Sequence, residues 1–254
     1  MTYAKFSLAI AASLAVLSVA QAADLPVKAV PMPPPATWTG FYAGGHLGAV
    51  WHLSDASIIG SGENDEGPWD PSANGSIGKA HGAGFIGGGQ FGYNWQKGDT
   101  VWGLEASISG LTGKATARND FANGAGAGNT IESKIDWLAT FRGRVGWLMH
   151  PDTLLYATGG LAVGGVKNVA APSGLAIPGF DRAVESRTKT GYVVGAGMEH
   201  RLNRDWRVAL EGLYVDLGSS SAPRSGNASG DGIVVHTHFK NAAVIGLLKI
   251  NRAF

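Results

Sequence analysis

The sequence predicts an all-β protein, an antiparallel up-and-down transmembrane β-barrel of about eight strands. Three observations predict this fold. The chain begins with an export signal, its later segments alternate apolar and polar residues, and its connectors alternate between short and long. A strand with one apolar and one polar face suits a wall between lipid and a polar interior.

The N-terminal residues have the pattern of a cleaved signal peptide. Lys5 is the only charged side chain before the apolar run 6–19, and Ala20-Gln21-Ala22 supplies the small residues that signal peptidase requires. An apolar run of about 14 residues is shorter than the roughly 20 that a membrane-spanning helix needs. We therefore expect residues 1–22 to be a signal peptide that is cleaved after Ala22.

Composition narrows the class of the exported protein. The 254 residues include 39 Gly, 8 Trp and no Cys, and only 15% are charged. An exported chain without cysteine has no disulfides, so its stability must come from one large core or from closure of a sheet. The 20 basic and 19 acidic residues nearly balance, which argues against nucleic acid as a partner because nucleic-acid binding needs a basic surface.

The exported part divides into a leader and one barrel domain. Residues 23–37 are rich in proline and predict an extended periplasmic leader, whereas residues 38–254 contain no comparable linker. Strands are expected near 38–53, 80–95, 100–112, 134–148, 154–166, 187–201, 206–217 and 236–254. The short connectors 96–99, 149–153 and 202–205 predict periplasmic turns, and the long connectors 54–79, 113–133, 167–186 and 218–235 predict extracellular loops.

Alternation also assigns residues to the two faces of each strand. In segment 41–53 the odd positions are apolar or small and the even positions include polar residues, a separation that a helix could not make. In segment 134–148 the same test groups Ile135 with Trp137 on the apolar face. Aromatic residues near the strand ends predict two girdles at the membrane interfaces: Trp38, Trp95, Trp102, Trp147, Trp206 and Phe254 at one end, and Trp51, Trp137 and Tyr214 at the other.

The inward faces carry charges of both signs. They belong to Glu105, Arg142, Arg144, Glu199, Arg201, Arg207, Glu211 and Lys249. A barrel of about eight strands is just wide enough to be filled by side chains, and buried charges must pair, so we expect an ion-pair network that makes the lumen a polar core. Glu105 with Arg142 and Glu211 with Lys249 are the favoured pairs, because each pair lies on strands adjacent in sequence.

No catalytic residue, cofactor or metal site is predicted, and an enzyme is not expected. The inward carboxylates are accompanied by a similar number of bases, which favours structural ion pairs over acid–base catalysis. Four histidines near the upper strand ends are weak candidates for ligands of haemin or a transition metal: His52, His81, His236 and His238. Their parity argues against one shared site, because His52 has the inward phase and the other three have the outward phase.

Several segments resemble a known family. The run Trp38-Thr39-Gly40-Phe41-Tyr42-Ala43-Gly44-Gly45, the mature start at 22–26, segment 210–218 and the terminal Phe254 resemble the small outer-membrane β-barrel surface antigens of alphaproteobacteria, described as porin-family or outer-membrane immunogenic proteins with an OmpA-like barrel. The resemblance extends over the whole mature chain.

The resemblance implies a location in the cell outer membrane, with outer-membrane lipid and lipopolysaccharide as partners. It also implies recognition of Phe254 by the barrel-assembly machinery. Such chains usually carry an aromatic residue two places before the terminal Phe, where this chain has Arg252, so we expect weaker recognition. Arg252 is expected to extend its guanidinium to the periplasmic interface instead.

These observations predict a structural and surface role in the Gram-negative envelope. Two alternatives stay open, a surface receptor for haemin or a metal and a narrow pore of low conductance. The long loops are where contacts with a host surface or with a second copy of the chain are expected.

Overall fold

The structure is a computed structural model, and it describes residues 37–61, 63–64, 67–68, 75–119, 127–174, 183–225 and 234–254. The predicted signal peptide 1–22 and the leader up to residue 36 lie outside the described residues. The side chains of 56–78, 117–129, 131, 170–183 and 220–237 are likewise not described. In the described part of the chain, no helix is long and apolar enough to cross a membrane.

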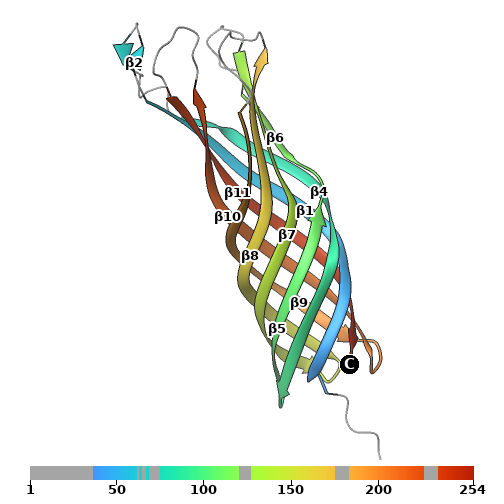
Figure 1. The fold of residues 1–254 in the computed structure, drawn as a ribbon. Helices are drawn as coiled ribbons and strands as arrows, with labels where there is room; N and C mark the ends of the chain where they lie inside the picture. The colour runs from blue at the N-terminus through green and yellow to red at the C-terminus, as the bar shows by residue number, and fades with distance from the viewer. Residues whose placement is uncertain are drawn as a thin grey trace, which may run out of the picture. The chain divides into compact units, whose positions relative to one another are not determined.

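The main sheet closes on itself as a barrel (Figure 1). Its strands are β1 (Gly40–Ser61), β4 (Gly75–Lys97), β5 (Thr100–Leu111), β6 (Ala115–Asn119), β7 (Ala127–His150), β8 (Thr153–Gly174), β9 (Ala183–Arg201), β10 (Trp206–Ser225) and β11 (Val234–Ala253). β5 and β6 both lie between β4 and β7 and share one place in the wall, so the nine strands fill eight places. β1 pairs with β4 and with β11, which completes the closure. All pairings are antiparallel, and the predicted fold class is confirmed.

The strands are longer than the sequence predicted. β7 has 24 residues and β4 has 23, whereas the bilayer needs only about 9 to 11 residues of a tilted strand. The predicted connector 113–133 in fact contains β6 and the first part of β7, and the predicted loop 54–79 contains the end of β1 and the start of β4. Beyond the bilayer no lipid requires an apolar outer face, so the alternation that identified the strands fades. A separate hairpin of β2 (Glu63–Asn64) and β3 (Gly67–Pro68) lies between β1 and β4 in sequence.

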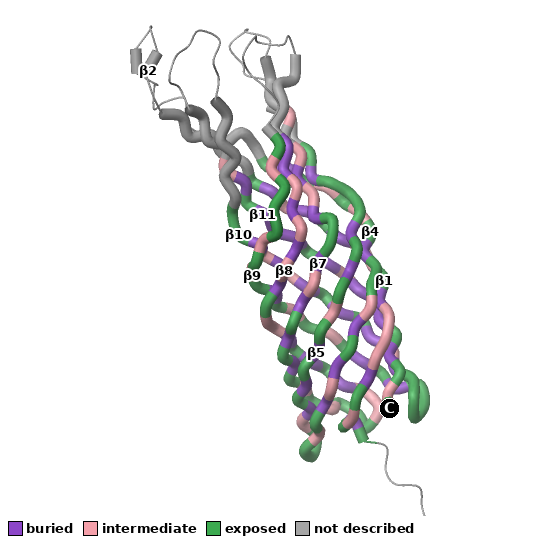
Figure 2. The backbone as a smooth tube through the Cα atoms, in the orientation of Figure 1, coloured by how far each residue is buried: buried purple, intermediate pink, exposed green. Residues whose placement is uncertain are grey.

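The outer wall is apolar. Exposed and buried residues alternate along the strands in Figure 2, and the exposed set includes Leu47, Phe85, Ile108, Phe141, Leu161, Leu210 and Leu248. Exposure of such an apolar surface to water would be unfavourable, whereas contact with lipid is favourable for the outer face of a membrane barrel. Trp95, Trp102, Trp147 and Trp206 are also exposed, as expected of the girdle beside the short turns.

Ile135 departs from the predicted pattern. It is buried, whereas Trp137, grouped with it by the alternation, is exposed. The register of β7 on β8 shifts here, because Ile135 pairs with Val166 and Trp137 pairs with the adjacent Gly165. One extra residue, Asp136, therefore forms a β-bulge, and a slip of one residue exchanges the two faces of a strand. The assignment of Ile135 to the outer face was wrong for this reason.

Gly113 separates β5 from β6, the two strands that lie one after the other between β4 and β7. Its φ is 84°, and a Cβ there would come within 2.5 Å of the carbonyl oxygen of Ala83. Both the backbone conformation and the close approach require glycine. After this irregular turn β6 continues along β4 and β7, whereas the sequence predicts a loop from residue 113 onward.

Candidate functional site: the barrel lumen

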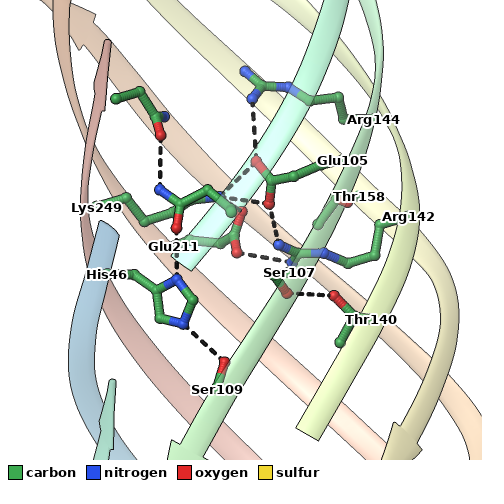
Figure 3. Close-up of polar contacts among 12 residues, drawn as sticks. His46, Glu105, Ser107, Ser109, Thr140, Arg142, Arg144, Thr158, Glu211 and Lys249 are labelled. Carbon is green, nitrogen blue, oxygen red and sulfur yellow. Dashed lines mark hydrogen bonds and ion pairs between the residues drawn. The ribbon is translucent and has the colours of Figure 1, made fainter. Parts of the chain in front are cut away.

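The barrel has two ends, which we name by their connectors. The turn end carries the short turns 98–99, 151–152 and 202–205, and the loop end carries the longer connections. Six buried charged residues form what we call the charged layer, on the turn side of the lumen's apolar residues: Glu105, Glu199, Glu211, Arg142, Arg144 and Lys249. Figure 3 shows the two acids Glu105 and Glu211 with the three bases. With Glu199, which pairs with Arg144, three acids face three bases in this layer.

Four of these side chains meet across the lumen. Glu105 on β5 and Arg142 on β7 are direct cross-strand partners and form an ion pair. Arg142 Nη1 also donates to Glu211 Oε1 on β10 at 2.8 Å. Lys249 Nζ on β11 donates to Glu105 at 2.8 and 2.9 Å and to Glu211 at 3.3 Å.

Both pairs favoured by strand adjacency are thus in contact. The structure adds two contacts that adjacency could not predict, Arg142 with Glu211 and Lys249 with Glu105, because they join strands that are not neighbours. Each carboxylate consequently contacts two bases from different parts of the wall. Such a network crosses the lumen instead of lining it.

Arg144 lies between two buried tyrosines. Its Nη2 donates to Glu199 Oε2 at 2.5 Å, and its Cζ is 4.3 Å from the ring centre of Tyr156 and 5.6 Å from that of Tyr42. The hydroxyl of Tyr42 donates to Glu105 at 2.8 Å, and that of Tyr156 donates to Glu211 at 2.7 Å. The tyrosines therefore link Arg144 to the other carboxylates. Sequence reasoning did not include them in the network, although Tyr42 has the inward phase of its strand.

Two glycines make room for these tyrosines. A Cβ on Gly92 would overlap the ring of Tyr42, and a Cβ on Gly197 would lie 2.6 Å from the hydroxyl oxygen of Tyr156. Both glycines lie on the wall against which a tyrosine ring rests. Their lack of a side chain is needed for the rings to reach the carboxylates.

Polar contacts continue from the charged layer to the opposite wall. Asn251 Nδ2 donates to Glu199 at 3.1 Å, and Gln90 Nε2 donates to Asn251 Oδ1 at 2.7 Å. The oxygen of Gln90 is 2.6 Å from Nδ1 of His46, whose Nε2 is 2.8 Å from the hydroxyl of Ser109. Both ring nitrogens of His46 are therefore used within the protein, which leaves neither for a metal ion.

Trp38 lies inside the turn end, contrary to its predicted place in the outer girdle. Trp38 is fully buried. Its backbone N–H donates to Gln96 Oε1 at 2.8 Å, and its indole N–H donates to the carbonyl of Pro151 at 3.1 Å. Trp38 precedes β1, and Gly40, with φ of 138°, allows the chain to turn into the lumen before the strand begins. The pattern of alternation does not apply to a residue outside the strand, which is why the prediction was wrong.

An apolar layer fills the lumen on the loop side of the charges. It consists of Val50, Ile86, Leu111, Ile135, Leu138, Ala162, Val166, Val193, Leu213, Val215, Leu217, Ala243, Ile245 and Leu247. The predicted polar core therefore describes only part of the lumen. Alternation places the charges on the inward faces, but apolar residues such as Val50 share the same inward phase, and the bulge turns Ile135 inward as well.

The candidate histidines do not come together. His52 is buried in the lumen with Nε2 3.2 Å from the carbonyl of Thr112, whereas His81 is exposed on the outside. His81 and His238 pair with Leu53 and Ser57 of β1, so they are about 13 Å apart along that strand at roughly 3.3 Å per residue. The backbone of His236 pairs with Ile59, and its side chain is not described. In the described part of the chain, no group of three or more His, Asp or Glu residues is arranged to hold a metal ion.

The C-terminal residues lie on the outside of the turn end. Phe254 is 73% exposed, and its backbone N–H donates to the carbonyl of Phe41 at 2.9 Å. The guanidinium of Arg252 is 5.7 Å from the Phe254 ring centre. The last residue is therefore fixed to β1 through its backbone while its ring is accessible.

Comparison with known proteins agrees with this architecture. Residues 9–241 match the model of the outer membrane protein beta-barrel domain family. The chain is 33% identical over 215 residues to the 31 kDa outer-membrane immunogenic protein of Brucella melitensis, covering 78% of this chain and 81% of the relative. It is 34% identical over 189 residues to the 22 kDa outer membrane protein of Rhizobium leguminosarum bv. viciae, covering 74% and 69%.

Among solved structures, the outer membrane protein OprG from Pseudomonas aeruginosa is similar with a TM-score of 0.45 at 12% identity, over 85% of this chain and 96% of that chain. The curated relatives named above are described as outer-membrane proteins, and their names mention no enzymatic activity. The chain belongs to the outer membrane protein beta-barrel domain family, and it is a protein of the cell outer membrane.

Proposed function

We propose that this protein is a structural, surface-exposed barrel of the outer membrane whose lumen is closed to ions. The observation that carries this proposal is the meeting of Glu105, Arg142, Glu211 and Lys249, from four different strands, in one place within the lumen. A water path would have to separate these buried pairs. Breaking one buried pair typically costs about 3 to 5 kcal/mol, so such an opening is rarely populated.

The apolar layer supports the same conclusion independently. Its side chains come from β1, β4, β5, β7, β8, β9, β10 and β11 and pack into one cluster. An ion that crossed this cluster would lose its hydration without gaining a polar partner. Two barriers of different chemistry therefore lie in series along the lumen, followed by Trp38 at the turn end.

A surface role follows by analogy with the relatives. The Brucella melitensis relative is named an immunogenic outer-membrane protein, and we infer that this chain likewise presents its loop end to the exterior as a surface antigen. Lipopolysaccharide is the lipid expected around that end. The exposed ring of Phe254 supports its proposed role as the signal for the barrel-assembly machinery.

Conductance measurement tests the closed lumen. We expect the purified barrel, reconstituted into a planar lipid bilayer in 1 M KCl as a chosen test condition, to give no discrete channel openings. Gel migration without boiling gives the folded fraction of each preparation, so that an absence of channel openings cannot be attributed to unfolded protein. Reproducible openings from a folded preparation would contradict the proposal and establish the narrow-pore alternative.

Haemin titration tests the receptor alternative. His52 lies inside the wall and His81 outside it, so the two imidazoles cannot share one iron through the sheet. We expect no saturable change in the haemin absorbance spectrum with the wild-type protein. Two variants, the single substitution His81→Ala and the double substitution His236→Ala, His238→Ala, should give the same result. A saturable change in the wild type that either variant loses would establish the receptor instead.

The buried carboxylates of the charged layer are unsuited to acid–base catalysis. Glu199 accepts from Arg144 and Asn251, and Glu211 accepts from Arg142, Tyr156 and Lys249. A carboxylate that is saturated by buried donors is a poor general acid or base, because it is neither free to accept a proton nor accessible to a substrate.

A further inference from the structure

Arg207 at the turn end is a buried cation with two nitrogens that no described residue accepts from. Its residue is 2% exposed, and neither Nε nor Nη1 has a hydrogen-bond partner among the described residues. A guanidinium donates through five N–H groups and remains charged under all ordinary conditions. Burying such a group without a compensating partner is strongly unfavourable.

A second arginine lies directly beside it. Arg201 on β9 is the cross-strand partner of Arg207 on β10, and it is also buried in the lumen. The Cζ atoms of Arg201 and Arg207 are 4.7 and 4.6 Å from the ring centre of Trp38. The indole gives each cation a favourable face, but like charges directly opposite each other on a sheet repel.

The neighbouring acids do not balance these two cations. Glu199, two residues before Arg201, already accepts from Arg144 at 2.5 Å and from Asn251 at 3.1 Å. Asp152 lies 3.5 Å from Arg201. Glu199 is thus paired with Arg144 in the charged layer, so beside Trp38 the two guanidiniums of Arg201 and Arg207 have Asp152 as their nearby acid, two positive charges against one negative.

We propose that the turn end is a binding site for a small oxyanion of the phosphate type, with Arg207 as its main ligand. The anion accepts from the unpartnered N–H groups of Arg207, Arg201 supplies the second positive charge, and Trp38 forms the apolar wall. Arginine suits this chemistry because its planar guanidinium matches the oxygens of phosphate and is weakly hydrated. The Asp152 side chain is 47% exposed, which places the Arg201 end of the site next to solvent at the turn end.

This site differs from the charged layer in a testable way. In the charged layer three acids match three bases, so no external anion is required. At the turn end the excess positive charge makes the folded barrel more stable when an anion is bound. A ligand that binds only the folded state raises the unfolding midpoint with its concentration until the site is saturated.

Thermal unfolding with inorganic phosphate as the probe tests the site. The folded full-length mature barrel is heated in a zwitterionic detergent at constant ionic strength, and gel migration without boiling reports the folded fraction. We expect the wild-type midpoint to rise with phosphate and reach a plateau, and the Arg207→Gln variant to show no rise. The control Arg252→Gln removes an exposed arginine near the same end and should keep the rise.

The same series separates binding from packing. If Arg207 only packs against Trp38, Arg207→Gln lowers the midpoint by the same amount at every phosphate concentration, and the proposal is overturned. The proposal also fails if the wild-type midpoint does not respond to phosphate.

Equilibrium dialysis with labelled phosphate gives a second measurement that does not depend on the stability of Arg207→Gln. We expect saturable binding of one phosphate per wild-type barrel and weaker binding by Arg207→Lys, which keeps the charge but loses the planar donor set. Absence of bound phosphate in the folded wild type would overturn the site.

Discussion

Replacing Glu105 with Ala is expected to lower the free energy of unfolding of the barrel by about 3 to 5 kcal/mol. Glu105 contacts Arg142, lies 2.8 Å from Lys249 Nζ and accepts from the Tyr42 hydroxyl at 2.8 Å. The substitution leaves two buried cations with one fewer carboxylate between them. The large effect comes from this uncompensated charge, more than from the attraction that is lost.

Urea unfolding of the protein in lipid vesicles measures this change. The matched control is Glu132→Ala, because Glu132 forms an ion pair of similar length, 2.7 Å, with Lys114 on the exposed part of the barrel. An exposed pair contributes between 0 and about 1 kcal/mol, so the control should unfold almost as the wild type does. Equal losses in the two variants would show that water reaches the charged layer, and this result would also contradict the closed lumen.

A double variant tests whether the charges act together. If Glu105 and Lys249 are coupled, Glu105→Ala combined with Lys249→Ala should cost less than the sum of the two single losses, because it removes one charge of each sign. Additive losses would mean that each charge is compensated independently of the other.

Much of the lumen could be predicted because it depends on alternation. The period of two placed Glu105, Arg142 and Glu199 on inward faces, and these residues lie inside the barrel. The partners across the lumen could not be predicted in the same way. They depend on the stagger of the strands around the closed barrel, and a single sequence does not fix that stagger. Adjacency found Glu105 with Arg142 but could not find Arg142 with Glu211.

The errors have local physical causes. A bulge of one residue reversed the face of Ile135, and Trp38 lies before the first strand, where alternation has no meaning. The extent of the strands was underestimated because the apolar outer face ends with the bilayer while the hydrogen-bonded sheet continues. Each error occurs where the chain is not a regular strand within the bilayer, because only in such a strand does burial force apolar and polar residues to alternate.

Gly48→Val is expected to prevent formation of most folded barrel, at a cost of more than about 3 kcal/mol. Gly48 has the inward phase of β1 and pairs with Leu247 of β11. A Cβ at this position would overlap the carbonyl oxygen of Gly246 and lie 3.1 Å from the Cα of Leu247. The obstacle is backbone, which cannot rotate away as a side chain can. The substitution would therefore separate β1 from β11, the pairing that joins the first strand to the last.

Gly212→Val is the control, because it adds the same side chain to a glycine on the outer face of β10. A Cβ there meets no atom within 4 Å, and it would project into lipid. We expect a free energy of unfolding within about 1 kcal/mol of the wild type, and no lower than it, because valine suits a strand better than glycine does. Gel migration with and without boiling and the urea midpoint measure both variants. If the two substitutions had the same effect, glycine would serve the barrel through backbone freedom on either face; a loss confined to Gly48→Val means that closure of the wall depends on the close approach of β1 and β11.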